Sequence, residues 1–169
     1  LGVVGGSLGA QFLNEVTTAL AADPSRDFSI IHLTGDLHID GISDQASSIE
    51  GWHPIAFEDD MPDLYAAADL VLSRAGALTI SELQATATPA VVVPLPAGGG
   101  YQALNAADLA SAGGVVIEPQ TDVATVAGRV RTLLSDASAL DRMGNALTTV
   151  DHKEAAATVA DRILEVGHA

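Results

Sequence analysis

The stretch SRAGALTISE, residues 73–82, decides the fold that we expect for this chain. It follows a short apolar run, Leu70 to Leu72, which predicts a buried strand, and it continues into a helical pattern that reaches about Ala87. The first turn of a helix leaves backbone N–H groups without partners, and these groups and the helix dipole together favour a phosphate. Glu82 falls in the second turn, where a carboxylate can accept hydrogen bonds from sugar hydroxyls. The stretch therefore indicates either a nucleotide site or an ordinary strand–turn–helix junction without a ligand.

Strands and helices alternate on both sides of this stretch. Strands are expected at residues 1–4, 28–33, 52–57, 70–72, 90–93 and 115–117, and helices at 10–22, 42–49, 58–68, 76–87, 101–112, 123–134, 137–147 and 154–166. This alternation predicts an α/β domain with a doubly wound, parallel, six-stranded sheet. Ligands in such sheets bind beyond the carboxyl ends of the strands. The loops at 5–10, 73–77 and 94–102 each follow a strand, so we expect them to converge on one crevice.

A second candidate phosphate turn is GGSLGA, residues 5–10. Its glycines allow the backbone to approach a ligand closely, and Ser7 offers a hydroxyl near the start of the following helix. The NAD fingerprint G-x-G-x-x-G would require glycine at position 4, where Val4 stands. Asp36 also comes later than the acidic residue that binds the ribose in such sites. We therefore expect no NAD site, and a purely structural turn remains the alternative.

Composition limits the classes of function that the chain can have. Its 169 residues suit one domain, and 48% of them are hydrophobic, which argues against disorder. Seven basic and 22 acidic residues give a formal net charge of −15, which argues against a nucleic-acid surface and against docking on anionic lipid. The chain has no cysteine, no long apolar run and no signal peptide, and we expect a cytoplasmic location. It begins directly with a strand, so we expect a domain of a longer protein.

Two further features have an ordinary structural interpretation. The acidic run Glu58 to Asp60 could suggest a metal site, but acids stabilise a first helical turn and Pro62 suits an early helical position. We therefore predict no metal and no cofactor. His32 lies within an apolar strand, and we expect it to have no chemical role.

Four motifs resemble the MurG family of UDP-N-acetylglucosamine transferases in peptidoglycan synthesis. They stand in the order and spacing of that family: GGSLGA at 5–10 followed by Asn14, FEDDM at 57–61, SRAGALTISE at 73–82 and QALNA at 102–106. The resemblance covers essentially the whole chain, and SRAGALTISE is its most specific part. It implies the C-terminal, donor-binding half of a GT-B glycosyltransferase, which has two Rossmann-like domains. Residues 1–169 would form this single UDP-sugar-binding domain.

The resemblance also implies how the donor UDP-N-acetylglucosamine would bind. Gly6 and Ser7 of the glycine turn would meet the diphosphate. The backbone N–H groups of Ala77, Leu78 and Thr79 would meet it from the second turn. No metal would be required.

The remaining donor contacts also follow from matching positions. Glu82 would bind the ribose hydroxyls. Phe57 and Glu58 fall where the backbone of the family contacts uracil, and Met61 lies beside them. These residues would hold the nucleoside half of the donor.

The sequence departs from the family pattern in the loop and helix that would contact the sugar. Gln102 and Asn105 are three residues apart on one helical face, and they would approach the N-acetylglucosamine ring. Ordinary capping and packing is the alternative for these two amides. Tyr101 stands where family members often carry histidine or glutamine, and Gly98–Gly100 is poor in side chains. The resemblance also implies that Asn14 and Arg74 belong to the donor-binding residues, without a definite role for Arg74.

The resemblance implies further partners for the complete protein. An N-terminal acceptor domain, absent from this chain, would bind lipid I, supply the general base and dock on the cytoplasmic face of the membrane. The alternatives are another GT-B transferase of UDP-sugars, a UDP-sugar epimerase and a non-catalytic nucleotide-binding module.

Overall fold

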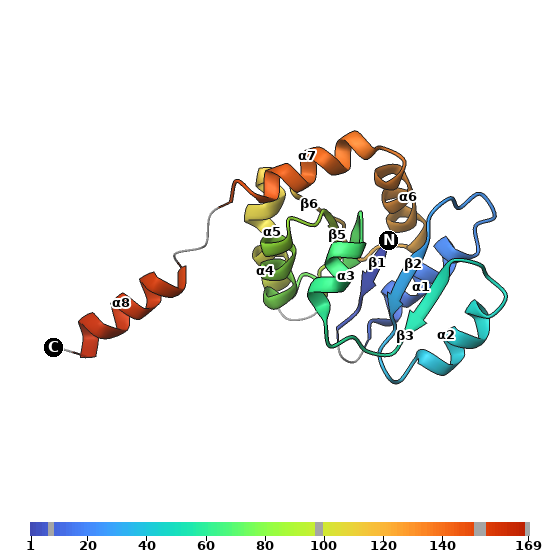
Figure 1. Ribbon diagram of the computed structural model, residues 1–169, viewed down its shortest axis with the longest axis horizontal. Coiled ribbons are helices and arrows are strands. Elements are labelled where there is room, and N and C mark those ends of the chain that lie inside the picture. The colour runs from blue at the N-terminus through green and yellow to red at the C-terminus, as the bar shows by residue number, and fades with distance from the viewer. Residues whose placement is uncertain (7–8, 97–99, 151–154, 168–169) are drawn as a thin grey trace.

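A six-stranded parallel sheet forms the centre of the molecule in the computed structural model, which describes residues 1–6, 9–96, 100–150 and 155–167 (Figure 1). The strands are β1 (Gly2–Val4), β2 (Ile30–Leu33), β3 (Trp52–Ile55), β4 (Val71–Ser73), β5 (Ala90–Val92) and β6 (Val115–Ile117). Their order across the sheet is β3-β2-β1-β4-β5-β6, and every neighbouring pair is parallel. The chain thus winds outward twice from the β1–β4 pair, which confirms the predicted doubly wound sheet.

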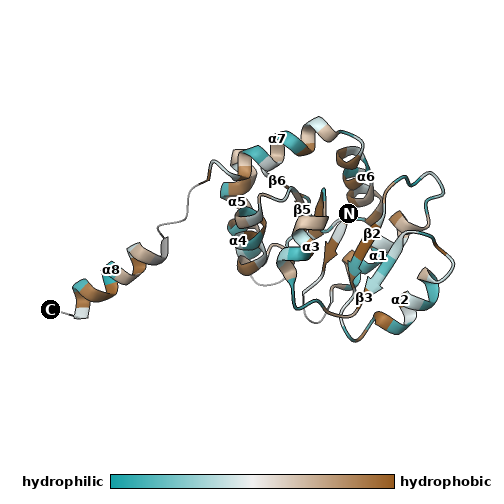
Figure 2. Ribbon diagram, viewed as in Figure 1, coloured by the Kyte–Doolittle hydropathy of each residue, from teal (hydrophilic) through white to brown (hydrophobic). Residues whose placement is uncertain are grey.

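Helices alternate with the strands as far as β6, and helices α1 to α7 cover the two faces of the sheet. They are α1 (Gln11–Ala21), α2 (Ile39–Ala46), α3 (Met61–Ala67), α4 (Ala77–Thr86), α5 (Tyr101–Ala112), α6 (Val123–Leu134), α7 (Ala137–Leu147) and α8 (Ala155–Gly167). In Figure 2 the central strands carry mostly hydrophobic colour, whereas the surrounding helices are mixed. Fully covered parallel strands show this composition because both of their faces are buried.

The core has two halves, one on each face of the sheet. On one face, α1, α2 and α6 bury residues such as Leu13, Ile42 and Val130 against Val3 and Leu72. On the other face, α3, α4, α5 and the end of α7 provide the buried side chains Leu64, Tyr65, Leu83, Leu109 and Leu147. Alternation along the strands explains this division, because successive residues point to opposite faces.

Several boundaries differ from the expected ones. The second helix begins at Ile39 rather than Ile42, because a turn in which His38 N–H bonds Gly35 O leads the chain into the helix early. The third strand ends at Ile55 rather than Phe57. The fourth strand extends through Ser73, which pairs with Val4 and Val92.

Helix α8 lies apart from the sheet in Figure 1, and its Val159, Ile163 and Val166 side chains are exposed. Among the described residues, no helix is long and apolar enough to span a bilayer.

Candidate functional site

The carboxyl ends of three neighbouring strands bring the predicted loops together. Val4 at the end of β1 pairs with Ser73 at the end of β4, and Ser73 pairs with Val92 at the end of β5. The loops that follow these residues therefore start side by side. This place is also where the winding of the sheet changes direction, the usual ligand position in doubly wound folds. The convergence that the sequence predicted is confirmed.

The glycine turn after β1 packs closely on the loop after β2. Gly6 and Gly9 have φ angles of +83° and +73°, which favour glycine, and Gly9 N–H donates to Gly6 O at 2.9 Å. A Cβ atom on Gly9 would lie 2.0 Å from the carbonyl oxygen of Thr34. The turn is thus fixed against Thr34, while Gly6 is exposed. Ser7 lies outside the described residues.

The second turn, after β4, presents backbone N–H groups that have no hydrogen-bond acceptor among the described residues. Gly76 caps α4 with an extended backbone and no side-chain hydrogen bond, and the helix begins at Ala77. Ile80 N–H makes an early helical bond, to Gly76 O at 3.0 Å. The preceding N–H groups, on Ala77, Leu78 and Thr79, therefore have no acceptor within the helix. Ala77 and Leu78 are exposed and Thr79 is half-buried, so this end of α4 can accept an anion.

Glu82 lies one turn further along α4, and its carboxylate accepts a hydrogen bond from the neighbouring helix α3. The hydroxyl of Tyr65 on α3 donates to Glu82 Oε2 at 2.8 Å. Tyr65 is almost fully buried, and this burial together with the bond to Glu82 raises the pKa of the phenol, so it remains a donor. A carboxylate has two acceptor oxygens, so the Glu82 group can still receive hydroxyl donors from a ligand.

The amides of Gln102 and Asn105 on α5 are each oriented by the backbone. Leu95 N–H donates to Gln102 Oε1 at 2.9 Å, and Asn105 Nδ2 donates to Ala75 O at 3.0 Å. These bonds fix the amide orientations, because a backbone N–H requires an oxygen and a carbonyl requires a nitrogen. Gln102 thus keeps a donor, and Asn105 keeps an acceptor, for a ligand. Gln102 thus contacts the loop after β5, and Asn105 contacts the loop after β4.

Arg74 joins the ends of two strands to the loop after a third. Its Nη1 donates to Val93 O at 3.1 Å and to Gln120 Oε1 at 2.8 Å. Burial lowers the pKa of this guanidinium from its ordinary value, but it stays charged at neutral pH. Through these contacts Arg74 links the end of β4 to the end of β5 and to the loop after β6. The neighbouring Ser73 hydroxyl is buried and has no hydrogen-bond partner among the described residues.

The segment Phe57 to Met61 runs from the edge strand β3 to the start of α3. Glu58 Oε1 accepts from Asp60 N–H at 2.9 Å, which closes the turn before the helix. Met61 packs partly into the core, whereas 57% of Phe57 is exposed. Because Tyr65 of α3 bonds Glu82 of α4, this segment ends beside α4. The acidic run does not form the first helical turn as predicted, because α3 begins only at Met61 and Glu58 to Asp60 form the turn before it. The described residues contain no cluster of three side chains that could hold a metal ion.

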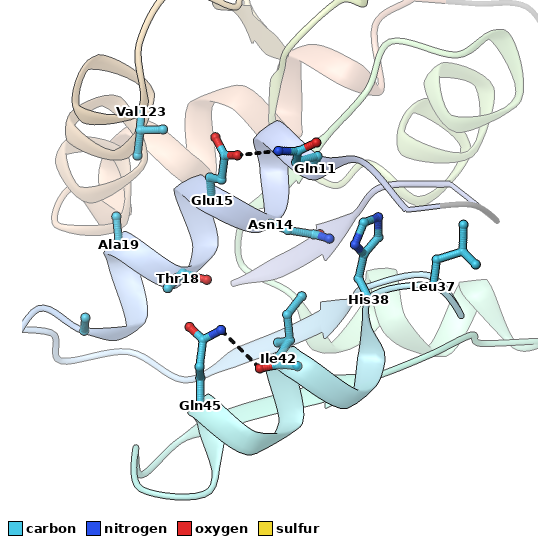
Figure 3. Close-up of a pocket in the computed structure, with 12 residues that line it drawn as sticks. Gln11, Asn14, Glu15, Thr18, Ala19, Leu37, His38, Ile42, Gln45 and Val123 are labelled. Atoms are coloured by element: carbon cyan, nitrogen blue, oxygen red, sulfur yellow. Dashed lines mark hydrogen bonds between the residues drawn. The ribbon is translucent and has the colours of Figure 1, made fainter.

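Asn14 is placed differently from the other predicted residues. It is 7% exposed, and both ends of its amide are bonded within the protein, to His32 and to Thr34. Asn14 also lines a groove of about 760 Å³ between α1 and α2 (Figure 3). The other predicted site residues do not line it. Two of its polar side chains are bonded within the protein: Gln11 donates to Glu15, and Gln45 donates to Gly41 O.

Sequence reasoning did not identify the side-chain hydrogen bonds of Tyr65, Gln120 and His32. A signal existed for two of them. A tyrosine next to Leu64 on the buried face of a helix requires a partner for its hydroxyl, and a histidine within an apolar strand requires partners for its ring nitrogens. Gln120 had no such signal, because it lies in an irregular loop after β6.

Comparison with known proteins places these features in a family. Residues 1–162 match the model of the glycosyltransferase family 28 C-terminal domain. The UDP-N-acetylglucosamine–N-acetylmuramyl-(pentapeptide) pyrophosphoryl-undecaprenol N-acetylglucosamine transferases of Paenarthrobacter aurescens and Rhodococcus erythropolis are 38% and 35% identical to the chain. The matches cover 96% and 97% of this chain but 45% and 43% of those relatives. The chain thus spans less than half of their length.

Solved structures agree with this similarity. The crystal structure of MurG from Acinetobacter baumannii superimposes with a TM-score of 0.82 at 29% identity, covering 97% of this chain and 49% of that one. A UDP-GlcNAc 2-epimerase from Neisseria meningitidis, solved with UDP-GlcNAc bound, gives a TM-score of 0.66 at 15% identity, covering 97% and 43%. The second likeness shows a common fold alone.

Proposed function

We propose a function from one premise: this chain belongs to glycosyltransferase family 28 and corresponds to its C-terminal domain. The fold is the Rossmann-like C-terminal half of a GT-B enzyme. In our proposal the chain binds UDP-N-acetylglucosamine as the donor domain of an N-acetylglucosaminyltransferase. The isolated domain binds this donor and turns over nothing.

The donor lies across the carboxyl ends of β1, β4 and β5 in this proposal. The N–H groups at Ala77, Leu78 and Thr79, with the turn at Gly6 and Ser7, hold the diphosphate. Backbone donors are well suited to a chain with a net charge of −15, because they bind an anion without a basic patch. No divalent metal is needed for this contact.

The nucleoside and the sugar occupy opposite sides of the diphosphate. Glu82 accepts the ribose hydroxyls, and the backbone at Phe57 and Glu58, beside Met61, contacts uracil. Gln102 and Asn105 approach the N-acetylglucosamine ring with the free ends of their amides.

The observation that carries the proposal is the bond between Tyr65 and Glu82 beside the free N–H groups of α4. A carboxylate one turn from a phosphate site repels the phosphate. The part of the ligand that contacts Glu82 must therefore be a hydrogen-bond donor without negative charge. Two adjacent sugar hydroxyls are such a group, since each donates to a carboxylate oxygen. A phosphate turn with a fixed carboxylate one turn later therefore favours a nucleoside diphosphate.

For the complete enzyme we propose transfer to lipid I in peptidoglycan synthesis, at the cytoplasmic face of the membrane. The muramyl 4-hydroxyl attacks the anomeric carbon with inversion, a base from the N-terminal half takes the proton, and UDP leaves. Negative charge develops on the departing UDP, and N–H groups already aimed at the diphosphate stabilise it. The relatives named above support this assignment, because both are named as N-acetylglucosamine transferases for N-acetylmuramyl-(pentapeptide) pyrophosphoryl-undecaprenol.

Competition among nucleotide sugars tests the donor assignment. UDP-N-acetylglucosamine should displace a fluorescent UDP probe better than UDP-glucose or a dTDP-sugar. Gln102→Ala and Asn105→Ala should each weaken UDP-N-acetylglucosamine about threefold to tenfold and leave UDP unchanged. Gln45→Ala on α2 is the matched control. Equal affinity for all these sugars would refute the assignment, and transfer to lipid I should appear only when the N-terminal half is joined.

A further inference from the structure

A buried polar network crosses the apolar core on the α1 side of the sheet. His32 of β2 is fully buried, Trp52 of β3 is 4% exposed, and their rings stack with centroids 6.1 Å apart. The His32 Nε2 atom lies 3.0 Å from Asn14 Oδ1, and Trp52 Nε1 lies 3.4 Å from His32 Nδ1. Asn14 Nδ2 continues the network to the carbonyl oxygen of Thr34 at 3.3 Å.

The chemistry of the partners determines the direction of every bond. Trp52 Nε1 can only donate, so His32 Nδ1 must accept, and the ring proton is on Nε2. That N–H donates to Asn14 Oδ1, which turns the amide nitrogen of Asn14 toward Thr34. Burial lowers the pKa of His32 to about 4, which keeps the ring neutral at physiological pH. A neutral ring with this tautomer is the only state that satisfies both neighbours.

The network ends at the atom against which the glycine turn packs. The Thr34 carbonyl accepts from Asn14, and its oxygen lies 2.0 Å from the position that a Cβ atom on Gly9 would take. Asn14 N–H bonds Ala10 O at 2.9 Å, so Asn14 also closes the first turn of α1, which the glycine turn enters. The position of Asn14 therefore couples β2 to both the turn and the helix start.

We propose that His32 is a positioning residue for the diphosphate site, acting through Asn14 and Thr34 on Gly6 and Gly9 of the glycine turn. This inference rests on the proposed function, because it assumes that the turn meets a diphosphate. His32 itself touches no ligand. It holds the amide of Asn14 in one orientation. In this orientation Asn14 donates to the Thr34 carbonyl and fixes the carbonyl against Gly9 of the turn.

Ligand affinities separate this role from a general effect on folding. His32→Leu preserves most of the side-chain volume but leaves Asn14 Oδ1 without its donor. It should weaken UDP about tenfold, the scale of one lost buried hydrogen bond, and leave uridine, which lacks the diphosphate, unchanged. His32→Gln should retain most of the UDP affinity, because its amide nitrogen can replace the Nε2 donor. His53→Leu on the exposed face of β3 is the matched control and should change neither ligand.

A second readout does not depend on UDP. The NMR amide signals of Gly5, Gly6 and Gly9 should shift in His32→Leu and not in His53→Leu. Asn14→Ala removes the hydrogen bonds to both His32 and Thr34 and should produce the same shifts. It replaces His32→Leu in this experiment if that variant does not fold. Unmoved glycine signals, or an equal loss of UDP and uridine affinity, would overturn the proposal. Failure of the wild type to bind UDP, with the glycine shifts still present, would instead refute the donor function alone.

Discussion

Glu82 combines a proposed ligand contact with a structural bond, and its variants should show both. If the carboxylate accepts ribose hydroxyls, Glu82→Ala removes hydrogen bonds to a charged group, each worth about 1.5–3 kcal/mol. We predict that UDP binds roughly tenfold to a hundredfold more weakly, and that Glu82→Gln loses less. Because Tyr65 then lacks its acceptor, Glu82→Ala should also lower the free energy of unfolding by about 1–3 kcal/mol.

A double cycle of protein and ligand changes measures the ribose contact directly. UDP lacking the 2′- or 3′-hydroxyl should bind the wild type more weakly and Glu82→Ala with little further loss. Tyr65→Phe is the companion variant, since it removes the supporting bond and keeps the carboxylate. If removal of a ribose hydroxyl weakens binding equally in the wild type and in Glu82→Ala, Glu82 does not contact the ribose and has a structural role only.

His32 should make the stability of the fold depend on pH. Its pKa is lowered from 6.5 to about 4 by burial, so the unfolded chain binds more protons between these values. The free energy of unfolding should therefore fall as the pH drops from 6.5 to 4, by about 3 kcal/mol in total from this group. Urea unfolding at pH 7 and pH 4.5 measures the change. His32→Gln should lose this part of the pH dependence, and His53→Gln should keep it.

At the scale of single residues, the sequence could predict which side chains sit at strand ends but not which partners they meet. Glu82 and Tyr65 are 17 residues apart on different helices, and only the packing of α3 on α4 joins them. His32 reads as an ordinary strand residue until Asn14 and Trp52 are placed beside it. Hydrogen-bond partners of this kind depend on tertiary contacts that no local pattern encodes.

Among the elements, the glycine turn after β1 is the most constrained by its surroundings. Gly9→Ala places a Cβ atom 2.0 Å from Thr34 O at a φ of +73°, so the backbone must move. We predict a loss of about 3 kcal/mol or more in the free energy of unfolding. Gly113→Ala at the end of α5 is the matched control, with a φ of +86° and open space around its Cβ position. It should cost about 1–2 kcal/mol, the strain of a left-handed residue alone. Equal losses in thermal or urea unfolding would show that the contact with Thr34 is unimportant.

The elements themselves were largely predictable, and their ends were not. Apolar runs such as Ala90–Val93 and helical periodicity gave the six strands and the helices in the right order. The boundaries moved where a turn or a neighbouring strand decides them: the turn at Gly35 starts α2 early, and pairing with Val4 and Val92 extends β4 to Ser73. Such local hydrogen bonds are invisible to a periodicity argument.

For the whole molecule, the convergence of loops from distant parts of the sequence was predictable because parallel strands have one common carboxyl edge. The family motifs gave the donor class from the same loops. What could not be predicted is which polar groups of the family motifs are exposed at the strand ends and which, like Asn14, are buried in the core. That distinction depends on the packing of α1 against β2.

Calorimetry of the wild-type chain with UDP and with NAD, in buffer containing EDTA, tests the central claim most directly. The intact second phosphate turn at Ala77–Thr79 and the missing glycine at Val4 predict that UDP binds and NAD does not. Backbone N–H groups hold the diphosphate in this account, so the UDP affinity should be the same after Mg²⁺ or Mn²⁺ is added. Binding of NAD more tightly than UDP, or UDP binding that appears only with the metal, would contradict it.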